Sequence, residues 1–511
     1  MQPMRGLTIA LLITFSIGIS LTARAQPTDP GFPYVDVNND GVYSPASGDI
    51  PLTSGQILSV IQSIGYFDTQ RSVNGIYHAP DHRASLVIPA SVSLSSDFPI
   101  KLRAGRNIVV HGFITAPKIH LRNGESEHED SSFSRWRPSC EDRSSPGQID
   151  LTGSFLTFTS ELKVKSKGEV IMDGTIMTDN DPTGKIKIKS KDKVSSLGAD
   201  ILAGNKLRIS GEEGVDLTGS GIVTTGLTPE TKISSDGQIV GDCFVATPGV
   251  LRFSADDGGV SANAGSIFAV GALGICSDGP TDVSGGYFVV TGPMIAEGEE
   301  GVNGNSSIIT SGQLRASGEG GVSFDSSYLD ALSGPISAKS EEGSVSFDGA
   351  NIATAGGLAI RSGDGEDDHP DALHRIKAQC EREHEGGDID IAGATIVADH
   401  FVKLNSGGSI SADYSSITPY GSPSSPADPD TPIALFAEGP ISADGATWTV
   451  PASIFLGSEE GNITAASATM SATGTPGTIT FYAGGGTITV SNSTFQGVVR
   501  YQPDGVTVVG P

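Results

Sequence analysis

Aromatic residues, cysteines and cationic side chains are all scarce in this sequence. Among 511 residues, 6% are aromatic, four are cysteine, and 32 lysines and arginines stand against 59 aspartates and glutamates. The net charge of −27 predicts that nucleic acid and anionic membranes are poor partners, and that divalent cations and cationic or neutral glycans are better ones. The low aromatic content suits a narrow core lined by small aliphatic side chains.

Long apolar segments are absent after the N-terminal region, so no later segment is expected to cross a bilayer. Near the N-terminus, Arg5 precedes an apolar run from Leu7 to about Leu21, and small residues follow it. This pattern predicts a secretory signal peptide at 1–25 and a mature chain that begins at Gln26. A membrane anchor is the alternative, but the run is short and interrupted by threonine, serine and glycine. We therefore expect a secreted protein, extracellular or held at a cell surface.

A glycine-punctuated acidic turn recurs along the chain at nearly constant spacing. Its first clear copy reads Ser-Gly-Glu-Glu-Gly, and the clear copies occupy residues 210–214, 254–258, 298–301, 317–321, 340–343 and 458–461. Between positions 237 and 343, successive turn glycines are 21, 21, 22, 20 and 22 residues apart. A fixed period of this size indicates a solenoid, in which each coil contacts only its neighbours.

Apolar residues alternate with polar ones on both sides of each turn. Leu207 and Ile209 precede the first clear copy, and Val215 and Leu217 follow it. Alternation with a period of two predicts short strands that bury every second side chain. Three such strands in about 22 residues predict an all-β, single-stranded parallel β-helix, with roughly sixteen coils over residues 85–511.

These coils resemble the repeats of filamentous-haemagglutinin-type proteins and autotransporter passengers. The resemblance rests on glycine turns flanked by alternating aliphatic residues, and it covers residues 85–511. It implies a right-handed β-helix and a non-catalytic, adhesin-like role as an extracellular surface scaffold. It also implies cell-surface or matrix glycans or proteins as partners, and it is compatible with self-association.

An oxygen-rich loop precedes the first coil. Asp36, Asn38 and Asp40 alternate along the chain and are followed by a glycine, which is the arrangement that a Ca²⁺ loop needs. Val42 would bind through its carbonyl group, and Asp49 would complete the ligand set. The segment resembles the loops of EF-hands and dockerin repeats, which implies calcium as the ligand. It departs from their pattern because the final carboxylate comes two positions late, and a metal-free turn rich in Asp and Asn is the alternative.

The whole segment 26–84 is expected to close the N-terminal end of the solenoid. Apolar residues recur at helical spacing after the loop, at Ile57, Leu58, Ile61 and Ile64. The exposed end of a solenoid needs a cap that prevents end-to-end growth. A loop made rigid by Ca²⁺ and followed by a helix would form this cap.

Three segments at about 124–146, 364–386 and 420–431 interrupt the coils. The first two are charged and resemble one another, with Cys140 and Cys380 at matching positions. Because loops carry function more often than coils do, these insertions leave a second hypothesis open: a carbohydrate-active β-helix enzyme, either a polysaccharide lyase or a glycosidase. Metal binding within the second insertion is a further alternative.

Charge is unevenly distributed along the predicted coils. Two early coils hold eight lysines, at positions 163, 165, 167, 185, 187, 189, 191 and 193. They form the one basic groove that the sequence offers, and no acidic partner recurs beside them at a fixed spacing. In later coils the acidic turns would stack into a ladder of carboxylates along one edge. Either cations between the coils or splaying of the side chains into water would relieve their repulsion.

Overall fold

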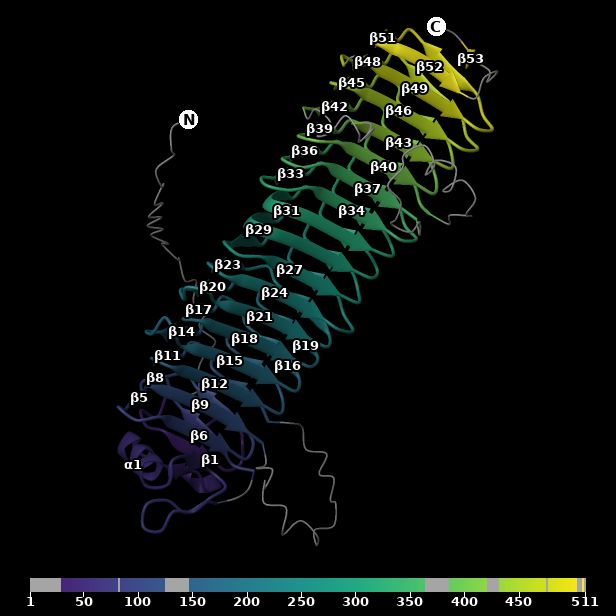
Figure 1. Ribbon diagram of the computed structural model, residues 1–511. Coiled ribbons are helices and arrows are strands. Elements are labelled where there is room, and N and C mark those ends of the chain that lie inside the picture. Colours follow the sequence, from purple (N-terminus) through teal and green to yellow (C-terminus); the bar gives the residue numbers. More distant parts are fainter. Residues whose placement is uncertain are drawn as a thin grey trace, which may run out of the picture.

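The computed structural model describes residues 29–80, 83–124, 147–363, 386–420, 432–474, 477–502 and 508–509. They form an all-β parallel solenoid of about 16 coils with about 22 residues per turn, as the sequence predicted (Figure 1). The expected signal peptide at 1–25 and the interiors of the three expected insertions lie outside these residues. In the part of the chain that the structure describes, α1 (Ser54–Ile64) is the one α-helix, and no helix is long and apolar enough to cross a membrane.

Each coil contributes one strand to each of three faces. For example, β7 (Ile108–Val110), β8 (Phe113–Thr115) and β9 (Lys118–Asn123) form one coil. The next coil starts with β10 (Ile149–Asp150), which pairs in parallel with β7. Because every coil repeats this pairing, each face is a parallel sheet that runs along the rod (Figure 1).

The first face consists of short strands, which are β4 (Ser85–Ile88), β7, β10, β13 (Val170–Ile171), β16 (Lys193–Ser195), β19 (Gly214–Asp216), β22 (Gln238–Val240), β25 (Val260–Ser261), β28 (Thr281–Asp282), β30 (Val302–Asn303), β32 (Val322–Ser323), β35 (Val345–Ser346), β38 (Ile389–Asp390), β41 (Ile410–Ser411), β44 (Ile441–Ser442), β47 (Ile463–Ala466), β50 (Ile488–Ser491) and β53 (Val508–Val509). The second face consists of β5 (Ser93–Ser95), β8, β11 (Phe155–Phe158), β14 (Ile176–Asp179), β17 (Asp200–Ala203), β20 (Gly221–Thr224), β23 (Phe244–Thr247), β26 (Ser266–Ala269), the first halves of β29 (Tyr287–Gly298) and β31 (Ile308–Gly318), β33 (Tyr328–Ala331), β36 (Asn351–Thr354), β39 (Thr395–Ala398), β42 (Ser416–Pro419), β45 (Thr447–Val450), β48 (Thr469–Ala472) and β51 (Thr494–Gln496).

The third face begins at β3 (Phe67–Asp68) and continues through β6 (Ile100–Ala104), β9, β12 (Glu161–Ser166), β15 (Lys185–Ser190), β18 (Lys206–Gly211), β21 (Glu230–Ser235), β24 (Val250–Ala255), β27 (Leu273–Ser277), the second halves of β29 and β31, β34 (Ile336–Ser340), β37 (Leu358–Ser362), β40 (Val402–Ser406), β43 (Ile433–Ala437), β46 (Ser453–Ser458), β49 (Thr478–Ala483) and β52 (Val498–Gln502). The second and third faces share one sheet because β29 and β31 pass through both.

In most strands of the coils, side chains alternate between the core and the solvent. In β15, Ile186 and Ile188 are buried, and the lysines at 185, 187 and 189 are exposed. Because the strands are paired in register, every inward position stacks on the same position of the next coil. The predicted period of two is therefore confirmed, and it also lines up the outward side chains in straight columns.

The acidic turns connect the third face to the first face, and they stack as predicted. The amide of Glu319 donates to the carbonyl oxygen of Glu299 in the coil before (3.0 Å), and the amide of Glu342 donates to the carbonyl oxygen of Glu319 (3.0 Å). A buried serine supports each of several turns from inside. Ser340, for example, accepts from the amide of Gly343 (2.9 Å).

A second kind of turn, between the first and second faces, was not singled out from the sequence. One residue in this turn adopts the left-handed conformation in most coils, with glycine in some (Gly349, φ 62°) and other residues elsewhere (Ser326, φ 56°; Tyr414, φ 58°). Carboxylates link consecutive turns of this kind. Asp325, for instance, accepts from the amide of Asp348 in the next coil (2.9 Å). The turn escapes a search for glycine repeats because its left-handed residue varies.

The core is mainly aliphatic, as expected, but it also contains stacked aromatic rings. Phe324 and Phe347 lie in successive coils with ring centroids 5.7 Å apart and an interplanar angle of 15°. Both are fully buried, as is Trp448, whose indole nitrogen donates to the hydroxyl oxygen of Ser415 (3.0 Å). The core therefore also accommodates large aromatic side chains, both alone and stacked in successive coils.

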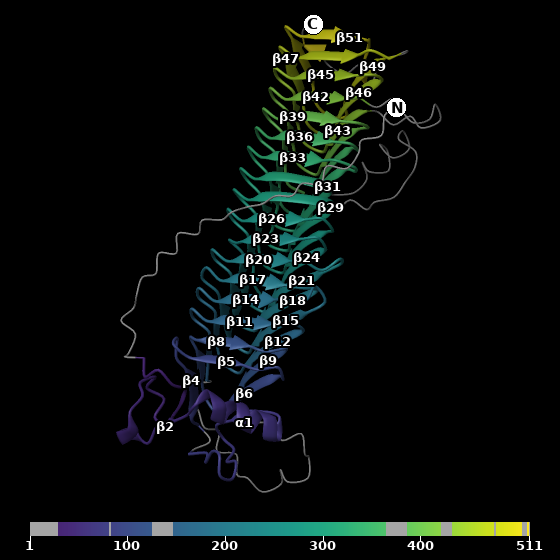
Figure 2. The same ribbon diagram turned by 90° about the vertical axis from the view of Figure 1, so that its left-hand side faces the viewer.

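The segment before the first coil covers the N-terminal end of the rod (Figure 2). β1 (Tyr34–Asp36) pairs antiparallel with β2 (Ile50–Pro51) and with β4, and α1 buries Ile57 against the core. Thr53 starts α1 through a capping box with Gln56, in which each side chain accepts from the other residue's amide (3.1 and 2.7 Å). The structure thus contains the loop-helix cap that the sequence predicted.

Candidate ligand-binding face

Seven consecutive coils carry a cationic or histidine side chain at the same outward position of the third face. The column, here called the central column, consists of Lys101, His120, Lys163, Lys187, Arg208, Lys232 and Arg252, one on each of β6, β9, β12, β15, β18, β21 and β24. Each member is paired in register with the next, so neighbouring members are about 4.8 Å apart along the rod at the backbone. The sequence predicted only the lysine-rich middle of this column.

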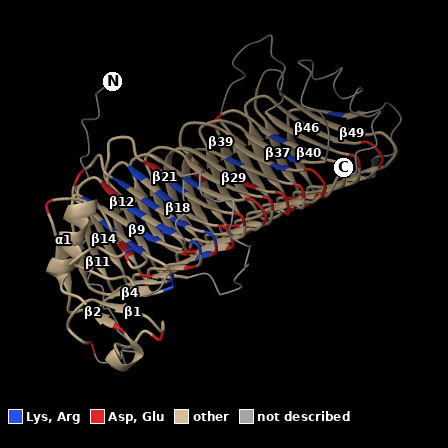
Figure 3. Ribbon diagram, turned by 90° about the horizontal axis from the view of Figure 1, so that it is seen from below, with Lys and Arg blue, Asp and Glu red and all other residues tan. Residues whose placement is uncertain are grey.

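A second column of cations runs beside the central column, two residues further along each strand. Arg103, Arg122, Lys165 and Lys189 occupy this position in four consecutive coils. The opposite flank is mixed, because Glu161 and Glu230 stand among lysines there. Figure 3 shows the basic residues gathered over the early strands of this face, and acidic residues along the edge of later coils.

Most of the central column has no nearby counter-charge. His120 contacts Glu161 (Nε2 to Oε2, 3.1 Å), and Arg208 contacts Glu230 (3.0 Å), together with Lys206 (2.8 Å). Among the described residues, no carboxylate lies within 4.0 Å of Lys101, Lys163 or Lys187. Like charges are therefore held side by side, which is unfavourable unless an anion lies over them.

The pKa of Lys165 reflects this crowding. Partial burial lowers it below the usual value for a lysine, and the charges of Lys163, Arg122, Lys187 and Lys189 lower it further. A bound anion would reverse the effect of the neighbouring charges, because it stabilises the protonated amine. The repulsion among these positive charges thus favours the binding of a negatively charged ligand to this face.

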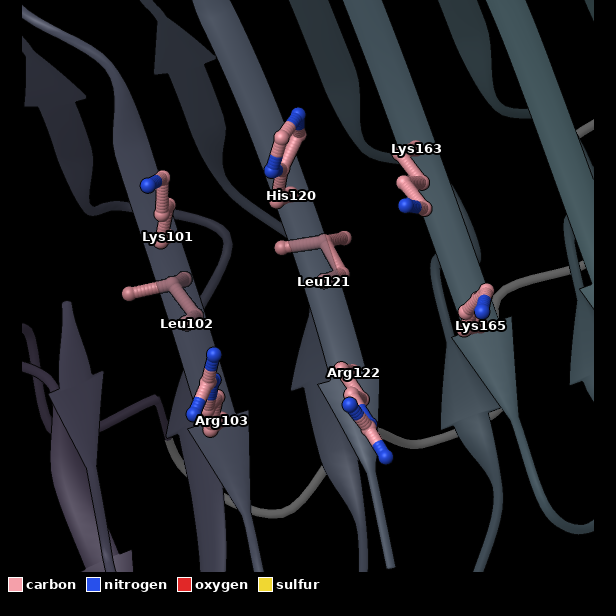
Figure 4. Close-up of a pocket in the computed structure, with 8 residues that line it drawn as sticks. All are labelled: Lys101, Leu102, Arg103, His120, Leu121, Arg122, Lys163 and Lys165. Carbon is pink, nitrogen blue, oxygen red and sulfur yellow. The ribbon is translucent and has the colours of Figure 1, made fainter. Parts of the chain in front are cut away.

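A shallow depression lies at the N-terminal end of this face. Its lining consists of Lys101, Leu102, Arg103, His120, Leu121, Arg122, Lys163 and Lys165 (Figure 4). They come from the three adjacent strands β6, β9 and β12, and the two leucines are buried members of the core. Arg103 is also held over the ring of Tyr66 from the cap, 4.3 Å from the ring centroid. The depression offers cations from three coils and no carboxylate in its lining.

The predicted calcium loop forms a compact turn around two buried carboxylates. Asp36 accepts from the amides of Asn39 (2.6 Å) and Gly41 (2.8 Å). Asp49 accepts from the amides of Val37 (2.9 Å) and Ser44 (2.7 Å). Both carboxylates are almost completely buried, and burial raises the pKa of Asp36. The loop therefore brings Asp36 and Asp49 together from opposite ends of the predicted ligand set.

The other predicted ligands of this loop lie nearer to its surface. Asp40 accepts from the amide of Val42 (2.8 Å) and from the side-chain amide of Asn38 (2.7 Å). The negative charges of Asp40 and Asp49 add to the raised pKa of Asp36. Hard carboxylate oxygens in this number fit the chemistry of Ca²⁺, although hydrogen bonds to the loop backbone engage them here. Among the described residues, no group of three His, Cys, Asp or Glu side chains is arranged around a single point as a metal site.

Cys243 and Cys276 are both free thiols. Cys243 points into the core, where burial raises its pKa to about 12. Cys276 points outward from β27 and contacts Glu297. Cys140 and Cys380 lie outside the described residues. The pKa of Cys276 is also raised, by partial burial and by the charge of Glu297, so the surroundings of both thiols disfavour the reactive thiolate.

No family model, curated protein or solved structure matches this chain. The resemblance to filamentous-haemagglutinin-type repeats therefore extends no further than the solenoid architecture that the structure contains. The function has to be inferred from the geometry of the faces.

Proposed function

We propose that this protein is a secreted, non-catalytic β-helix scaffold that attaches to an anionic polymer at a cell surface or in a matrix. The central column carries the proposal, because it places seven basic side chains in register on an otherwise acidic chain. Secretion rests on the sequence of residues 1–25. An adhesin-like role agrees with the solenoid, which presents a long, flat surface without needing a moving part.

The composition of the depression favours binding over hydrolysis. A glycosidase needs two carboxylates that flank the scissile bond. The depression is lined by six cationic or histidine side chains and two leucines, and the carboxylate of Glu161, on the same strand as Lys163, is engaged by His120. Such a lining binds an anionic group through charge-assisted hydrogen bonds, and it holds no pair of acids that would cleave a glycosidic bond.

The test is the binding of immobilised acidic polysaccharide by the mature chain. Replacing Lys163 and Lys187 together by glutamine is expected to lower the affinity about tenfold, because two charge-assisted contacts are lost. The matched control places Thr447→Glu and Thr469→Glu on the second face. Both threonines are exposed and lie in paired positions of neighbouring coils, so the control has the same net charge and the same spacing of altered residues.

Equal weakening by the two double variants would show that net charge alone decides binding, and would contradict the proposal. The length of the recovered polymer should be measured in the same assay. Shortening of the polymer by the wild-type chain would support the carbohydrate-active enzyme instead.

We also propose that Ca²⁺ binds the loop of Asp36, Asn38, Asp40, Val42 and Asp49 and stiffens the cap. Removing Ca²⁺ with EDTA is expected to lower the melting temperature of the mature chain. The stabilisation would be about 2.7 kcal/mol at a concentration 100 times the Kd. Asp36→Ala combined with Asp40→Ala should abolish the difference between the two conditions, as measured by thermal unfolding.

An equal Ca²⁺ effect on wild type and variant would move the metal site to the acidic turns. If Ca²⁺ has no effect on either protein, the calcium proposal is wrong. Neither outcome bears on the cationic face, because the loop lies in the cap and the face lies on the coils.

A further inference from the structure

We infer that the anionic ligand is a linear acidic polysaccharide that lies parallel to the solenoid axis, with one anionic group over each coil of the central column. This inference rests on the proposed function, since it concerns the same face. It adds the chemical class of the polymer, the direction of the polymer relative to the solenoid axis, and the number of sugars that the protein contacts.

The direction follows from where positive charge is continuous. Along the rod, the central column runs unbroken from Lys101 to Arg252 over seven paired strands. Across a strand, only three side chains point outward, and Glu161 and Glu230 interrupt the outer position. A polyanion that crossed the face along one strand would therefore meet at most three basic side chains, and on β12 and β21 it would also meet a carboxylate. A polyanion along the axis meets a cation in every coil.

The spacing suits an extended glycan. Neighbouring members of the column are about 4.8 Å apart, which is the spacing of paired strands. An extended chain of pyranose sugars advances by about one ring length per sugar, a similar distance. A polymer with one carboxylate or sulfate group on each sugar would thus place one anionic group over each coil. Lysine and arginine bind such groups by charge-assisted hydrogen bonds.

Nucleic acid fits this surface less well. Proteins that bind single strands combine cations with aromatic side chains on which the bases stack. On β6, β9, β12, β15, β18, β21 and β24, all of which are described in full, no Phe, Tyr or Trp side chain points outward. The base edges of a duplex are recognised by an element that enters one of its grooves. The outward side chains of this face instead form columns along a sheet, from which no such element projects. The seven strands therefore present charge at a regular spacing and no row of Phe, Tyr or Trp side chains on which bases would stack.

The column has defined ends. After Arg252 the same position is occupied by Gly274 and then by Ile295, which carry no charge. Before Lys101 the third face ends at β3 of the cap. The central column can therefore contact about seven consecutive sugars of the polymer.

The experiment measures the affinity of the mature chain for polyuronate oligosaccharides of about two to twelve sugars by calorimetry. The affinity is expected to rise with length up to about seven sugars and then to level off. The slope of log affinity against log salt should also steepen with length, because each added contact releases counterions. Arg252→Gln, at the end of the column away from the depression, should weaken the binding of a seven-sugar ligand several-fold and barely change that of a trisaccharide.

Arg315→Gln is the matched control. Arg315 points outward at the same position of the third face but lies beyond the uncharged gap, so this variant should leave all affinities unchanged. A plateau at two or three sugars would show that the ligand crosses the face, which overturns the inference but keeps the proposed function. Equal affinity for a single-stranded DNA of the same charge would overturn the polysaccharide class. If Lys163→Gln with Lys187→Gln changes no affinity at any length, the proposed function itself fails.

Discussion

Replacing Phe324 by alanine is expected to lower the free energy of unfolding by about 3–5 kcal/mol, the usual cost of removing a buried phenyl ring. Phe324 is fully buried in the turn that follows β32, and its ring stacks on that of Phe347 in the next coil. On the other side, the ring fills the space above Gly304, where a Cβ atom would lie only 2.2 Å from a ring carbon. Three successive coils thus share one aromatic packing unit.

The cost should be near the upper end of this range because the cavity cannot collapse. Hydrogen bonds between the coils hold the backbone on both sides, such as the bond from the amide of Phe324 to the carbonyl oxygen of Ser346 (2.9 Å). The measurement is equilibrium unfolding by denaturant, with hydrogen exchange to locate the damage. Phe324→Leu is the control, and it should cost about half as much since most of the volume remains. A loss below about 1 kcal/mol for the alanine variant would show that this stack does not hold the coils together.

At two glycines of the same coil, asparagine and alanine are expected to differ in opposite directions: asparagine should be tolerated worse than alanine at Gly343 and better than alanine at Gly349. Gly343 ends an acidic turn and lacks a positive φ, but a Cβ atom there would lie 2.2 Å from the carbonyl oxygen of Gly320. Gly349 has a φ of 62°, and the nearest atom to its Cβ position is 3.8 Å away. The first glycine is needed for close approach of two coils, and the second for its backbone conformation.

At Gly343, alanine should destabilise the protein by about 1–3 kcal/mol through overpacking, and asparagine should cost more because it is larger. At Gly349, alanine should cost about 1–2 kcal/mol, and asparagine should cost less because it tolerates the left-handed conformation. Thermal unfolding of the four variants tests both expectations. If asparagine is better tolerated than alanine at both positions, close stacking is not the reason for the turn glycine.

The charge of this protein illustrates how a sequence total can mislead. A net charge of −27 predicts poor binding of polyanions. In the fold, however, Lys101 and Arg252 belong to one continuous column, although they are 151 positions apart in the chain. Their alignment depends on the register of seven strands. Only the two lysine-rich strands, β12 and β15, are visible as a cluster in the sequence.

The loop proposed to bind calcium could be recognised in the sequence because its candidate ligands are close together in the chain. The sequence placed Asp36 and Asp49 in one predicted ligand set, and the structure buries both in one loop. The sequence did not reveal that backbone amides already satisfy these carboxylates. That fact depends on how the chain turns between the two residues, and it makes the test with EDTA necessary.

The sequence by itself determined the solenoid, its period, its inward residues and its capping helix. Each of these follows from local patterns: glycine turns about 22 residues apart, apolar residues at every second position, and helical spacing in one short segment. The tertiary structure decided the length of the central column, the variable left-handed turn and the packing of Phe324 on Gly304. These features arise from contacts between coils, where residues 19 to 44 positions apart become neighbours, and the register of the strands fixes which of them meet.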